Sequence, residues 1–371
     1  MEIIVAGGGL VGLSAAASLR QLGHQVTVLE QAAEIRAVGA GIGLWDNALH
    51  EFDHIGVGAA VRAMGQEINA WFFDAAGRSR RAPGTSDRDY RFLLVPRAPL
   101  NNVLADAIGR EHIVLDARAV GFSEDDEGVT VRLADGRTLR TGLLIGADGV
   151  HSRIREQLLP GTEARAHAGH VAWRAIVPSG AERPEGTVLT VGGARTRGGY
   201  SRVAEGQTMW MVNQFDAGPL VGGKRDRALL RARNLTENGW QDDLLAMIAD
   251  TPEDAILENQ IMLVPALPRW SGARVTLIGD AAHGLSPHLS AGGTLGIEDV
   301  TVLRDALSTA PSPSDALVRY EQARLPRFAR VREFADQVEN AAGPAEFAAR
   351  YAEFSSWMLA TQPGRGSARP T

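Results

Sequence analysis

The first thirty residues contain two short apolar runs separated by a stretch with helical spacing. Residues 2–6 and 25–29 are apolar and rich in β-branched side chains, which predicts two strands. Between them, residues 13–22 are rich in Ala and Leu and are followed by Gly23, a residue common just after a helix. Two strands joined by one helix predict a parallel pair with a crossover helix.

The predicted secondary structure changes twice along the rest of the chain. Short alternating runs separated by turn residues predict a mostly antiparallel sheet in the middle, and an apolar run at 274–278 predicts one more buried strand. Helical spacing dominates after residue 315. The predicted strands of the middle region are 68–73, 92–95, 113–120, 129–133, 138–139, 171–177, 187–191, 200–203 and 208–215, and the predicted helices are 99–110, 225–234, 241–249, 316–324, 327–337 and 345–359.

The turn between the first two predicted strands carries a dinucleotide-binding fingerprint. Gly7, Gly9 and Gly12 match G-x-G-x-x-G, with a strand before them and a helix after them. The first glycine allows the tight turn, the second lets the backbone reach a pyrophosphate, and the third lets helix and strand pack closely. Glu30 ends the second strand, where a carboxylate accepts a hydrogen bond from a ribose hydroxyl. The motif predicts a dinucleotide without separating FAD from NAD, and its alternative is a structural glycine-rich turn.

Composition and charge remove several classes of function. The 371 residues include no Cys and a single Lys, Lys224. Thiol nucleophiles, thiolate metal sites and disulfides are therefore excluded, and any Schiff base or Walker lysine must be Lys224. A net charge of −6 gives no reason to expect nucleic acid or an anionic membrane as partner. No targeting segment and no membrane-length apolar run is visible, so we expect a soluble cytoplasmic protein, as a monomer or homodimer.

The single lysine lies in a sequence that matches part of a P-loop. Residues 218–224 fit G-x-x-x-x-G-K, but Arg225 stands where Ser or Thr would hold Mg²⁺, and Pro219 removes one backbone N–H. A nucleotide triphosphate site is one interpretation of this segment. The other is a polar connection between a strand and a helix, which we favour.

Two further segments deliver an Asp at the end of an apolar strand. Residues 143–146 run into Ala147-Asp148-Gly149, and residues 275–278 run into Gly279-Asp280. The carboxyl ends of strands in α/β sheets are where ligands bind. Taken singly, either Asp also fits a turn in which it hydrogen-bonds its own backbone.

Together, these three motifs resemble those of the single-component FAD-dependent aromatic hydroxylases of the para-hydroxybenzoate hydroxylase type. The resemblance covers about residues 1–340 and implies an α/β fold, in which a Rossmann-like FAD-binding domain is interleaved with a mostly antiparallel substrate-binding sheet and followed by C-terminal helices. The FAD-binding domain would comprise 1–68, 96–166 and 264–310, the substrate domain 69–95 and 167–263, the helices 311–362, and a disordered tail 363–371.

The resemblance also implies roles for individual residues. The glycines would hold the pyrophosphate, Arg97 the phosphates and ribityl chain, Asp148 FAD and NAD(P)H, and Asp280 the ribityl chain. A helix beginning near Thr294 would aim its N–H groups at the flavin. The implied FAD-binding positions are Gly7, Gly9, Leu10, Val11, Gly12, Glu30, Arg36, Arg97, Val120, Asp148, Asp280, Pro287, Gly292, Gly293 and Thr294.

One departure concerns the loop after Asp280. The family usually has Pro-x-x-Gly-Gln-Gly, whereas this chain has Pro287, then Ser290 and Ala291 in place of Gly and Gln, then Gly292. We expect FAD binding to survive with an altered flavin environment. Residues 39–49 are similar to a segment of pyridine-ring monooxygenases, which favours a small aromatic or heteroaromatic acid as substrate.

The family's activity is hydroxylation of an aromatic ring with NAD(P)H and O₂, through a flavin C4a-hydroperoxide. This chemistry needs no metal and no protein nucleophile, so it fits a chain without Cys. His288 follows Pro287 and is the candidate proton-handling group, with a surface loop His as the alternative. The candidate substrate residues on the antiparallel sheet are Trp71, Phe73, Trp173, Arg197, Tyr200 and Trp210, although aromatic side chains at strand spacing are often core.

Other classes of function remain open at this point. A flavin-dependent halogenase would need a lysine between flavin and substrate, and Lys224 is poorly placed for that. A related flavin oxygenase would perform epoxidation or Baeyer–Villiger insertion. The remaining alternative is a non-catalytic FAD-binding sensor or redox protein. The replacement of the family's Gln by Ala291 favours this alternative.

Overall fold

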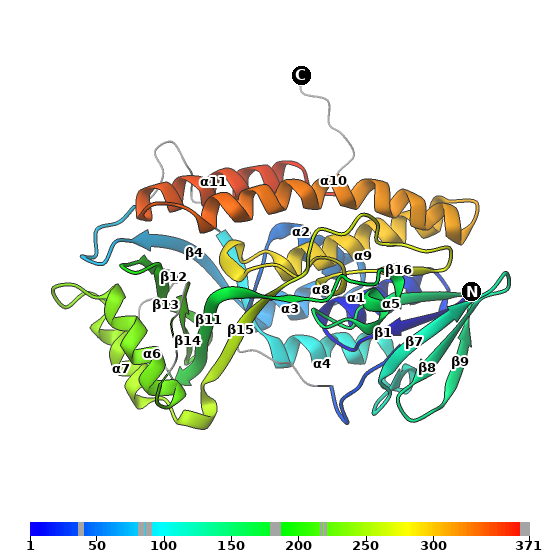
Figure 1. The fold of residues 1–371 in the computed structure, drawn as a ribbon, viewed down its shortest axis with the longest axis horizontal. Coiled ribbons are helices and arrows are strands. Elements are labelled where there is room, and N and C mark those ends of the chain that lie inside the picture. Colours follow the sequence, from blue (N-terminus) through cyan, green and yellow to red (C-terminus); the bar gives the residue numbers. More distant parts are fainter. Residues whose placement is uncertain are drawn as a thin grey trace, which may run out of the picture.

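The computed structural model describes residues 1–35, 41–80, 86, 91–178, 187–215, 218 and 221–363. Their strands form a parallel sheet of five strands, a mixed sheet of eight strands and an antiparallel sheet of three strands. Two long helices lie across the top of the molecule in Figure 1, spanning both larger sheets. No helix in this described part of the chain combines the length and the apolar character that a membrane crossing requires.

The parallel sheet has the strand order β16-β10-β1-β2-β6. The central strand β1 pairs with β2 on one side and with β10 on the other, so that Ile3 lies between Val26 and Leu143. The buried side chains of β1 and β10 make this sheet the centre of the larger hydrophobic core. The strands are β1 (Glu2–Ala6), β2 (Gln25–Leu29), β6 (Ile113–Val114), β10 (Leu143–Gly146) and β16 (Val275–Leu277).

The mixed sheet has the order β15-β11-β14-β13-β12-β4-β5-β3 and is antiparallel except where β12 pairs with β4. The third sheet is the hairpin set β7-β8-β9, at the right of Figure 1. The strands are β3 (Gly41–Leu44), β4 (Gln66–Phe73), β5 (Arg91–Pro96), β7 (Ala119–Glu124), β8 (Val129–Leu133), β9 (Thr138–Thr141), β11 (Arg165–Pro178), β12 (Thr187–Val191), β13 (Thr196–Ala204), β14 (Gln207–Gln214) and β15 (Leu257–Leu263).

The helices cover different faces of these sheets. α6 and α7 cover one face of the mixed sheet and form a second, smaller core with it, at the left of Figure 1. α9, α10 and α11 pack on the larger core. The helices are α1 (Leu10–Gln21), α2 (Asp46–His54), α3 (Gly58–Met64), α4 (Arg97–Ile108), α5 (Arg153–Leu158), α6 (Lys224–Ala232), α7 (Asp242–Asp250), α8 (Asp280–His283), α9 (Gly292–Thr309), α10 (Pro313–Glu339), α11 (Pro344–Ala360) and the short 3₁₀ helices η2 (Arg110–His112), η3 (Arg233–Leu235), η4 (Glu253–Ala255) and η5 (Pro287–Leu289).

Most predicted elements are present, with two differences. The run 113–120 is not one strand, because Asp116 takes a positive φ of 51° and separates β6 from β7. The two helices predicted at 316–324 and 327–337 are one helix, α10, which runs through Pro326. The predicted domain boundaries at 68, 95 and 167 fall inside strands and stay predictions, while the tail beyond residue 363 lies outside the described residues.

In the segment that matched part of a P-loop, a carboxylate binds the backbone N–H groups that a phosphate would need. Glu253 accepts hydrogen bonds from the backbone N–H groups of Lys224 and Arg225, the latter at 3.1 Å, and its negative charge occupies the N-terminus of α6. The Lys224 ammonium donates to the carbonyl oxygen of Ile256 at 3.1 Å. A phosphate at this helix end would meet a carboxylate, so the polar-connection interpretation fits the structure and the nucleotide triphosphate interpretation does not.

Candidate active site

The turn from β1 to α1 admits no side chain at two of its glycines. Gly7 has a φ of +118°, and a Cβ there would lie 2.3 Å from the carbonyl oxygen of Ala147. A Cβ on Gly12 would lie 2.0 Å from the carbonyl oxygen of Gly7. Both positions require glycine, because helix α1 packs directly against the turn and against the end of β10.

Gly9, in contrast, faces open space. It precedes α1, a Cβ there would meet nothing within 4 Å, and no side chain caps the helix. The first N–H groups of α1 are therefore available to an anion, which the helix dipole also favours. Leu10 and Val11 point into the protein instead, where Leu10 packs near Gly293 and Val11 packs against Gly279 and Gly296.

Glu30 closes this turn from the neighbouring strand. Its carboxylate accepts a hydrogen bond from the Gly8 N–H at 2.8 Å and one from the Ala32 N–H at 2.8 Å. The acid is thus fixed beside the glycines, where the sequence motif predicts a ribose contact. Val120 lies further along, in β7, and its side chain is 42% exposed.

Asp148 is directed toward a helix end. Its Oδ2 accepts from the N–H groups of Arg153 at 2.8 Å and Ile154 at 3.3 Å, at the start of α5. Its Oδ1 is buried without a hydrogen-bond partner among the described residues, and burial raises the pKa of this carboxyl. An orphaned buried oxygen of this kind is a position where a bound molecule supplies the missing donor.

The third motif brings Asp280 near Arg97. Gly279 has a positive φ of 59°, and the exposed Asp280 begins α8. Arg97 begins α4; burial lowers its pKa, and the Asp280 carboxylate opposes that shift. Arg174, on β11, is also near Arg97. Burial lowers the pKa of Arg174, and the positive charge of Arg97 lowers it further. Arg97 thus interacts electrostatically with both the Asp280 carboxylate and the Arg174 guanidinium.

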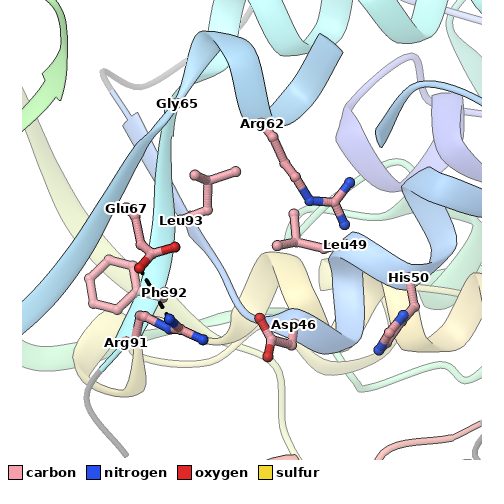
Figure 2. A pocket seen from close by; sticks show the side chains of 9 residues that line it. All are labelled: Asp46, Leu49, His50, Arg62, Gly65, Glu67, Arg91, Phe92 and Leu93. Atoms are coloured by element: carbon pink, nitrogen blue, oxygen red, sulfur yellow. Dashed lines mark hydrogen bonds and ion pairs between the residues drawn. The ribbon is translucent and has the colours of Figure 1, made fainter. Parts of the chain in front are cut away.

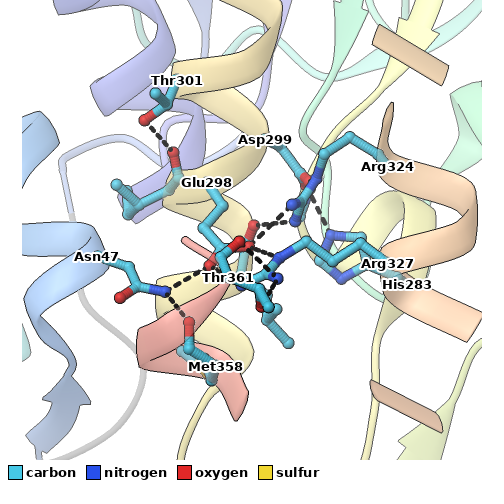
Figure 3. A network of polar contacts seen from close by, with 12 residues as sticks. Asn47, His283, Glu298, Asp299, Thr301, Arg324, Arg327, Met358 and Thr361 are labelled. Carbon is cyan, nitrogen blue, oxygen red and sulfur yellow. Dashed lines mark hydrogen bonds and ion pairs between the residues drawn. The ribbon is translucent and has the colours of Figure 1, made fainter. Parts of the chain in front are cut away.

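A buried network of charges joins α9 to α10 (Figure 3). Arg324 of α10 donates to Asp299 at 2.7 Å and to Glu298 at 2.8 Å, and all three side chains are buried. Asp299 also accepts from the backbone N–H of Gly279 at 2.8 Å and contacts His283 Nε2 at 2.6 Å. Burial alone would raise the pKa values of both acids, but Arg324, with His283 beside Asp299 and Arg327 beside Glu298, holds them below their usual range.

The loop between α8 and α9 carries the sequence departure. Ser290 has a φ of 50° and a ψ of 30°, the left-handed conformation that a glycine adopts at lower cost. The indole N–H of Trp45 donates to the Ser290 carbonyl oxygen at 3.1 Å, and the Trp45 backbone N–H donates to Thr294 Oγ1 at 3.0 Å. A Cβ on Gly292 would meet nothing within 4 Å, and no side chain caps α9. The start of α9 thus offers free N–H groups.

The mixed sheet has one face toward these motifs and one away from them. One contact links the inner face to the loop after Asp280: the rings of His170 and His288 stack at 5.0 Å. Val203 and Met209, also on this face, pack against Gly41 of β3. The register places Arg174, Met211 and Leu189 on this face as well.

Five of the six predicted substrate residues lie on the opposite face. Trp173, Tyr200 and Trp210 are buried in the smaller core with α6 and α7, and Trp173 donates to Glu258 at 2.5 Å. Trp71 pairs with Val188 and is 41% exposed, and Phe73 packs on Trp240 at 4.7 Å. These five placements do not fit the substrate prediction. Side chains alternate between the two faces of a strand, and these five rings lie on the face covered by α6 and α7, away from the motif segments.

The family of the chain follows from comparison with known proteins. Residues 1–335 match the model of the FAD binding domain family. A curated relative, the aurachin C monooxygenase/isomerase of Stigmatella aurantiaca, is 33% identical over 335 residues, covering 88% of this chain and 86% of the relative. The FAD-dependent urate hydroxylase of Klebsiella pneumoniae is 31% identical over 336 residues, with the same coverage of 88% and 86%. The chain belongs to this family.

A solved structure agrees with that assignment. The crystal structure of Klebsiella pneumoniae HpxO complexed with FAD and uric acid has a TM-score of 0.82 and 26% sequence identity, and it matches 96% of this chain and 93% of its own. Membership in the FAD-dependent aromatic hydroxylases confirms the predicted family, the mixed α/β fold, the FAD cofactor and the assignment as an oxidoreductase.

The residues present fit FAD. The open N-terminus of α1, the space above Gly9 and the orphaned Asp148 oxygen lie in the motif segments, and the open N-terminus of α9 with the space above Gly292 follows the third motif. Pro287 begins η5, within the loop between α8 and α9. The individual FAD contacts remain predictions, and Arg36 lies outside the described residues.

His288 and Arg197 belong to a buried cluster at the loop between α8 and α9, residues 284–291, which is the predicted flavin-binding loop and contains His288. His288 Nε2 lies 2.5 Å from Ser286 Oγ and 3.5 Å from Glu339 Oε2. Burial lowers the pKa of His288 to about 4, although the Glu339 carboxylate opposes this shift. His288 is therefore neither a surface residue nor charged at neutral pH.

Arg197 has structural partners in this cluster. It donates to the carbonyl oxygens of Val338 and Glu339 at 3.0 and 2.8 Å, at the end of α10, and its guanidinium lies 5.0 Å and 4.6 Å from the ring centres of Phe215 and Phe347. Burial lowers its pKa to about 10. Its Nη1, in contrast, is buried without a hydrogen-bond partner among the described residues, so this donor stays open to the predicted substrate carboxylate.

A separate cavity of about 500 Å³ lies between α2, α3, β4 and β5 (Figure 2). Its charged side chains carry both signs, and Glu67 pairs with Arg91 at 3.2 Å. None of the predicted site residues line it. The lining residues are Asp46, Leu49, His50, Arg62, Gly65, Glu67, Arg91, Phe92 and Leu93.

Replacing Gly9 with alanine is expected to weaken FAD binding without unfolding the protein. The added methyl group meets no protein atom within 4 Å, but it occupies the space through which the backbone approaches a pyrophosphate. We expect FAD affinity to fall at least about tenfold, or about 1.4 kcal/mol, in a flavin fluorescence titration. Gly343→Ala is the matched control, because Gly343 also precedes a helix and its Cβ also faces open space. Equal FAD affinity in both variants would contradict the assignment.

Proposed function

We propose that this protein uses NAD(P)H and O₂ to hydroxylate a small aromatic or heteroaromatic compound bound on the inner face of the mixed sheet. The observation that carries the proposal is the direction of that face: it is turned toward the Pro287–Gly293 segment of a chain that belongs to the FAD-dependent aromatic hydroxylases. Bound FAD supplies the redox chemistry, since it accepts hydride and activates oxygen.

The protein's own residues supply position and shielding. Ile176, Leu189 and Met211 are partly exposed apolar side chains on the inner face, and they suit a flat apolar ring. Asn213 lies beside them in register with Ala172 and Arg197, and Arg174 lies in register with Met211. We assign substrate contacts to these side chains in place of the five aromatic residues on the opposite face.

The substrate class follows from this lining and from the relatives. A mostly apolar wall with one guanidinium and one amide suits a ring that carries a few polar substituents. Urate hydroxylase and 3-hydroxybenzoate 6-hydroxylase, 28% identical to this chain over 363 residues, are named for substrates of this kind. The proposal places the protein in the cytoplasm, where NAD(P)H is supplied, and keeps the prediction of a monomer or homodimer.

A stopped-flow screen of flavin reduction tests the proposal. Purified protein saturated with FAD is mixed with NADH or NADPH in the presence of aromatic acids, phenols, hydroxypyridines and purines. We expect one group of compounds to accelerate reduction, and labelled O₂ to place one oxygen atom in a hydroxylated product. Insertion of oxygen next to a carbonyl, or an epoxide, would indicate the related oxygenases. No acceleration by any compound would indicate a sensor or redox protein and overturn the proposal.

A further inference from the structure

Three imidazoles and a carboxylate gather where the flavin-binding loop, the mixed sheet and α10 meet. His167 and His170 come from β11, His288 from η5 and Glu339 from the last position of α10. The ring of His170 lies 5.0 Å from that of His288 and 4.2 Å from that of Phe215, in stacked geometry. His170, His288 and Glu339 are each more than 45 positions from the next in sequence, so the fold assembles this group.

Glu339 bridges two of the imidazoles. Its Oε1 lies 2.6 Å from His167 Nε2, and its Oε2 lies 3.5 Å from His288 Nε2. The side chains become more exposed along this path, from 3% for His288 through 14% for Glu339 to 21% for His167. A continuous series of exchangeable groups therefore runs from the interior of the loop to the surface.

The charges around the path keep its inner end neutral. Besides Glu339, the charged or titratable groups that face His288 are His167, His170 and Arg197, and Arg195 approaches Glu339 Oε1 at 4.0 Å. Burial would raise the pKa of Glu339, but the two histidines lower it to about 2, so the carboxylate is ionised. Burial, with the charges of His288 and His167, lowers the pKa of His170 to about 3.

Stability alone does not account for this arrangement. Both ring nitrogens of His170 are buried without a hydrogen-bond partner among the described residues, and buried polar groups of this kind cost free energy that apolar side chains would not. Groups held away from their usual pKa values next to a binding site are typical of functional positions. The cluster adjoins the loop that follows Asp280 and leads into α9.

The proposed hydroxylation gives these groups a task. One ring C–H becomes C–OH, the second oxygen atom of O₂ becomes water, and NAD(P)H gives up a hydride, so each turnover takes one proton from solvent. The site is shielded, so this proton needs a route through the protein.

We propose that His167, Glu339 and His288 form the path by which this proton moves between solvent and the flavin-binding loop. A proton enters at His167 Nε2, passes to the Glu339 carboxylate, and moves from Oε2 to His288 Nε2, while the imidazole releases its Nδ1 proton to the reacting group in the shielded site. The resting imidazole therefore carries its proton on Nδ1, and Nε2 accepts from Ser286 Oγ at 2.5 Å. This inference rests on the proposed function.

Glu339→Gln tests the path, because the amide keeps the shape of the side chain but does not carry a proton. We expect kcat to fall about 100-fold, with KM and FAD content within about twofold of the wild type, and the solvent isotope effect on kcat to rise. Added imidazole should restore part of the lost rate. Glu339→Asp, which keeps a carboxylate, should retain more activity than Glu339→Gln.

Glu333→Gln is the matched control, since it makes the same change on an exposed, ion-paired side chain of the same helix. An unchanged kcat in Glu339→Gln would overturn the path. A fall in kcat that imidazole does not relieve and that follows lost FAD or lost folded protein would also overturn it, because Glu339 would then be structural.

A second measurement separates this inference from the proposed function. In resting protein labelled with ¹⁵N-histidine, NMR at pH 7.5 should find the His288 proton on Nδ1. A proton on Nε2 would overturn the path whatever the enzyme does, because Nε2 could not then accept from Glu339. If the wild type hydroxylates nothing in the screen above, the proposed function fails and the path has no reaction to serve, even when the proton is on Nδ1.

Discussion

Replacing Arg324 with methionine is expected to lower the free energy of unfolding by about 3–5 kcal/mol, because it leaves buried carboxylates without their partner. Arg324 is fully buried and is bound to both Asp299 and Glu298. Asp299 also holds the backbone of Gly279, so the loss should extend to the third FAD motif. Urea unfolding at pH 7, with flavin content measured on the same samples, tests this expectation.

Arg350→Met provides the control for that experiment. Arg350 pairs with Glu346 and Glu353, but all three side chains are exposed. Exposed pairs of this kind contribute about 0–1 kcal/mol. A loss below about 1 kcal/mol in Arg324→Met would mean that the carboxylates find other partners, and the buried network would not be needed for stability.

Acidification from pH 7 to pH 5 is expected to destabilise the protein by about 2 kcal/mol for each of His170 and His288. Their folded pKa values are lowered to about 3 and about 4 from an ordinary 6.5. The unfolded chain therefore binds more protons between pH 6.5 and these values, and stability falls as the pH falls through that window. Glu339, with a pKa lowered to about 2, stays ionised at pH 5 and does not contribute.

Variants without these imidazoles show whether they are the cause. His170→Phe and His288→Phe keep a ring in the stack and should each reduce the difference in unfolding free energy between pH 7 and pH 5. His54→Phe makes the same change at an exposed position at the end of α2 and should leave the difference unchanged. An equal pH dependence in all three variants would assign the acid sensitivity to other groups.

The FAD-binding part of the fold could be predicted because its signals are local. Gly7 and Gly12 are required by contacts within the turn or with the next strand of the sheet, and strand, turn and helix follow one another in sequence. The same holds for Glu30, which ends β2 and meets Gly8. The local sequence therefore predicts both the glycine motif and the strand, turn and helix in which it lies.

The substrate side could not be predicted in the same way. Alternation assigns Tyr200 and Trp210 to one face of the sheet, but it does not say which face α6 and α7 cover. Nor does any local pattern connect Glu339 with His288, which are 51 positions apart and meet only through packing of α10 on η5. Ser290 departs from the family pattern in the sequence, but the sequence does not show that its backbone is left-handed.

The strand order β16-β10-β1-β2-β6 has a consequence for synthesis of the chain on the ribosome. Strand β1 is made first, but the residues that complete its side of the sheet, β10 and β16, end at Gly146 and Leu277. At about 5–20 residues per second, Leu277 follows Glu2 by roughly 14–55 seconds. The glycine turn lacks Ala147 until β10 has been made, and Glu298 and Asp299, which follow β16, are made before Arg324 can neutralise them. We therefore expect FAD to bind a nearly finished polypeptide, and a nascent chain stalled before α10 to emerge without the cofactor.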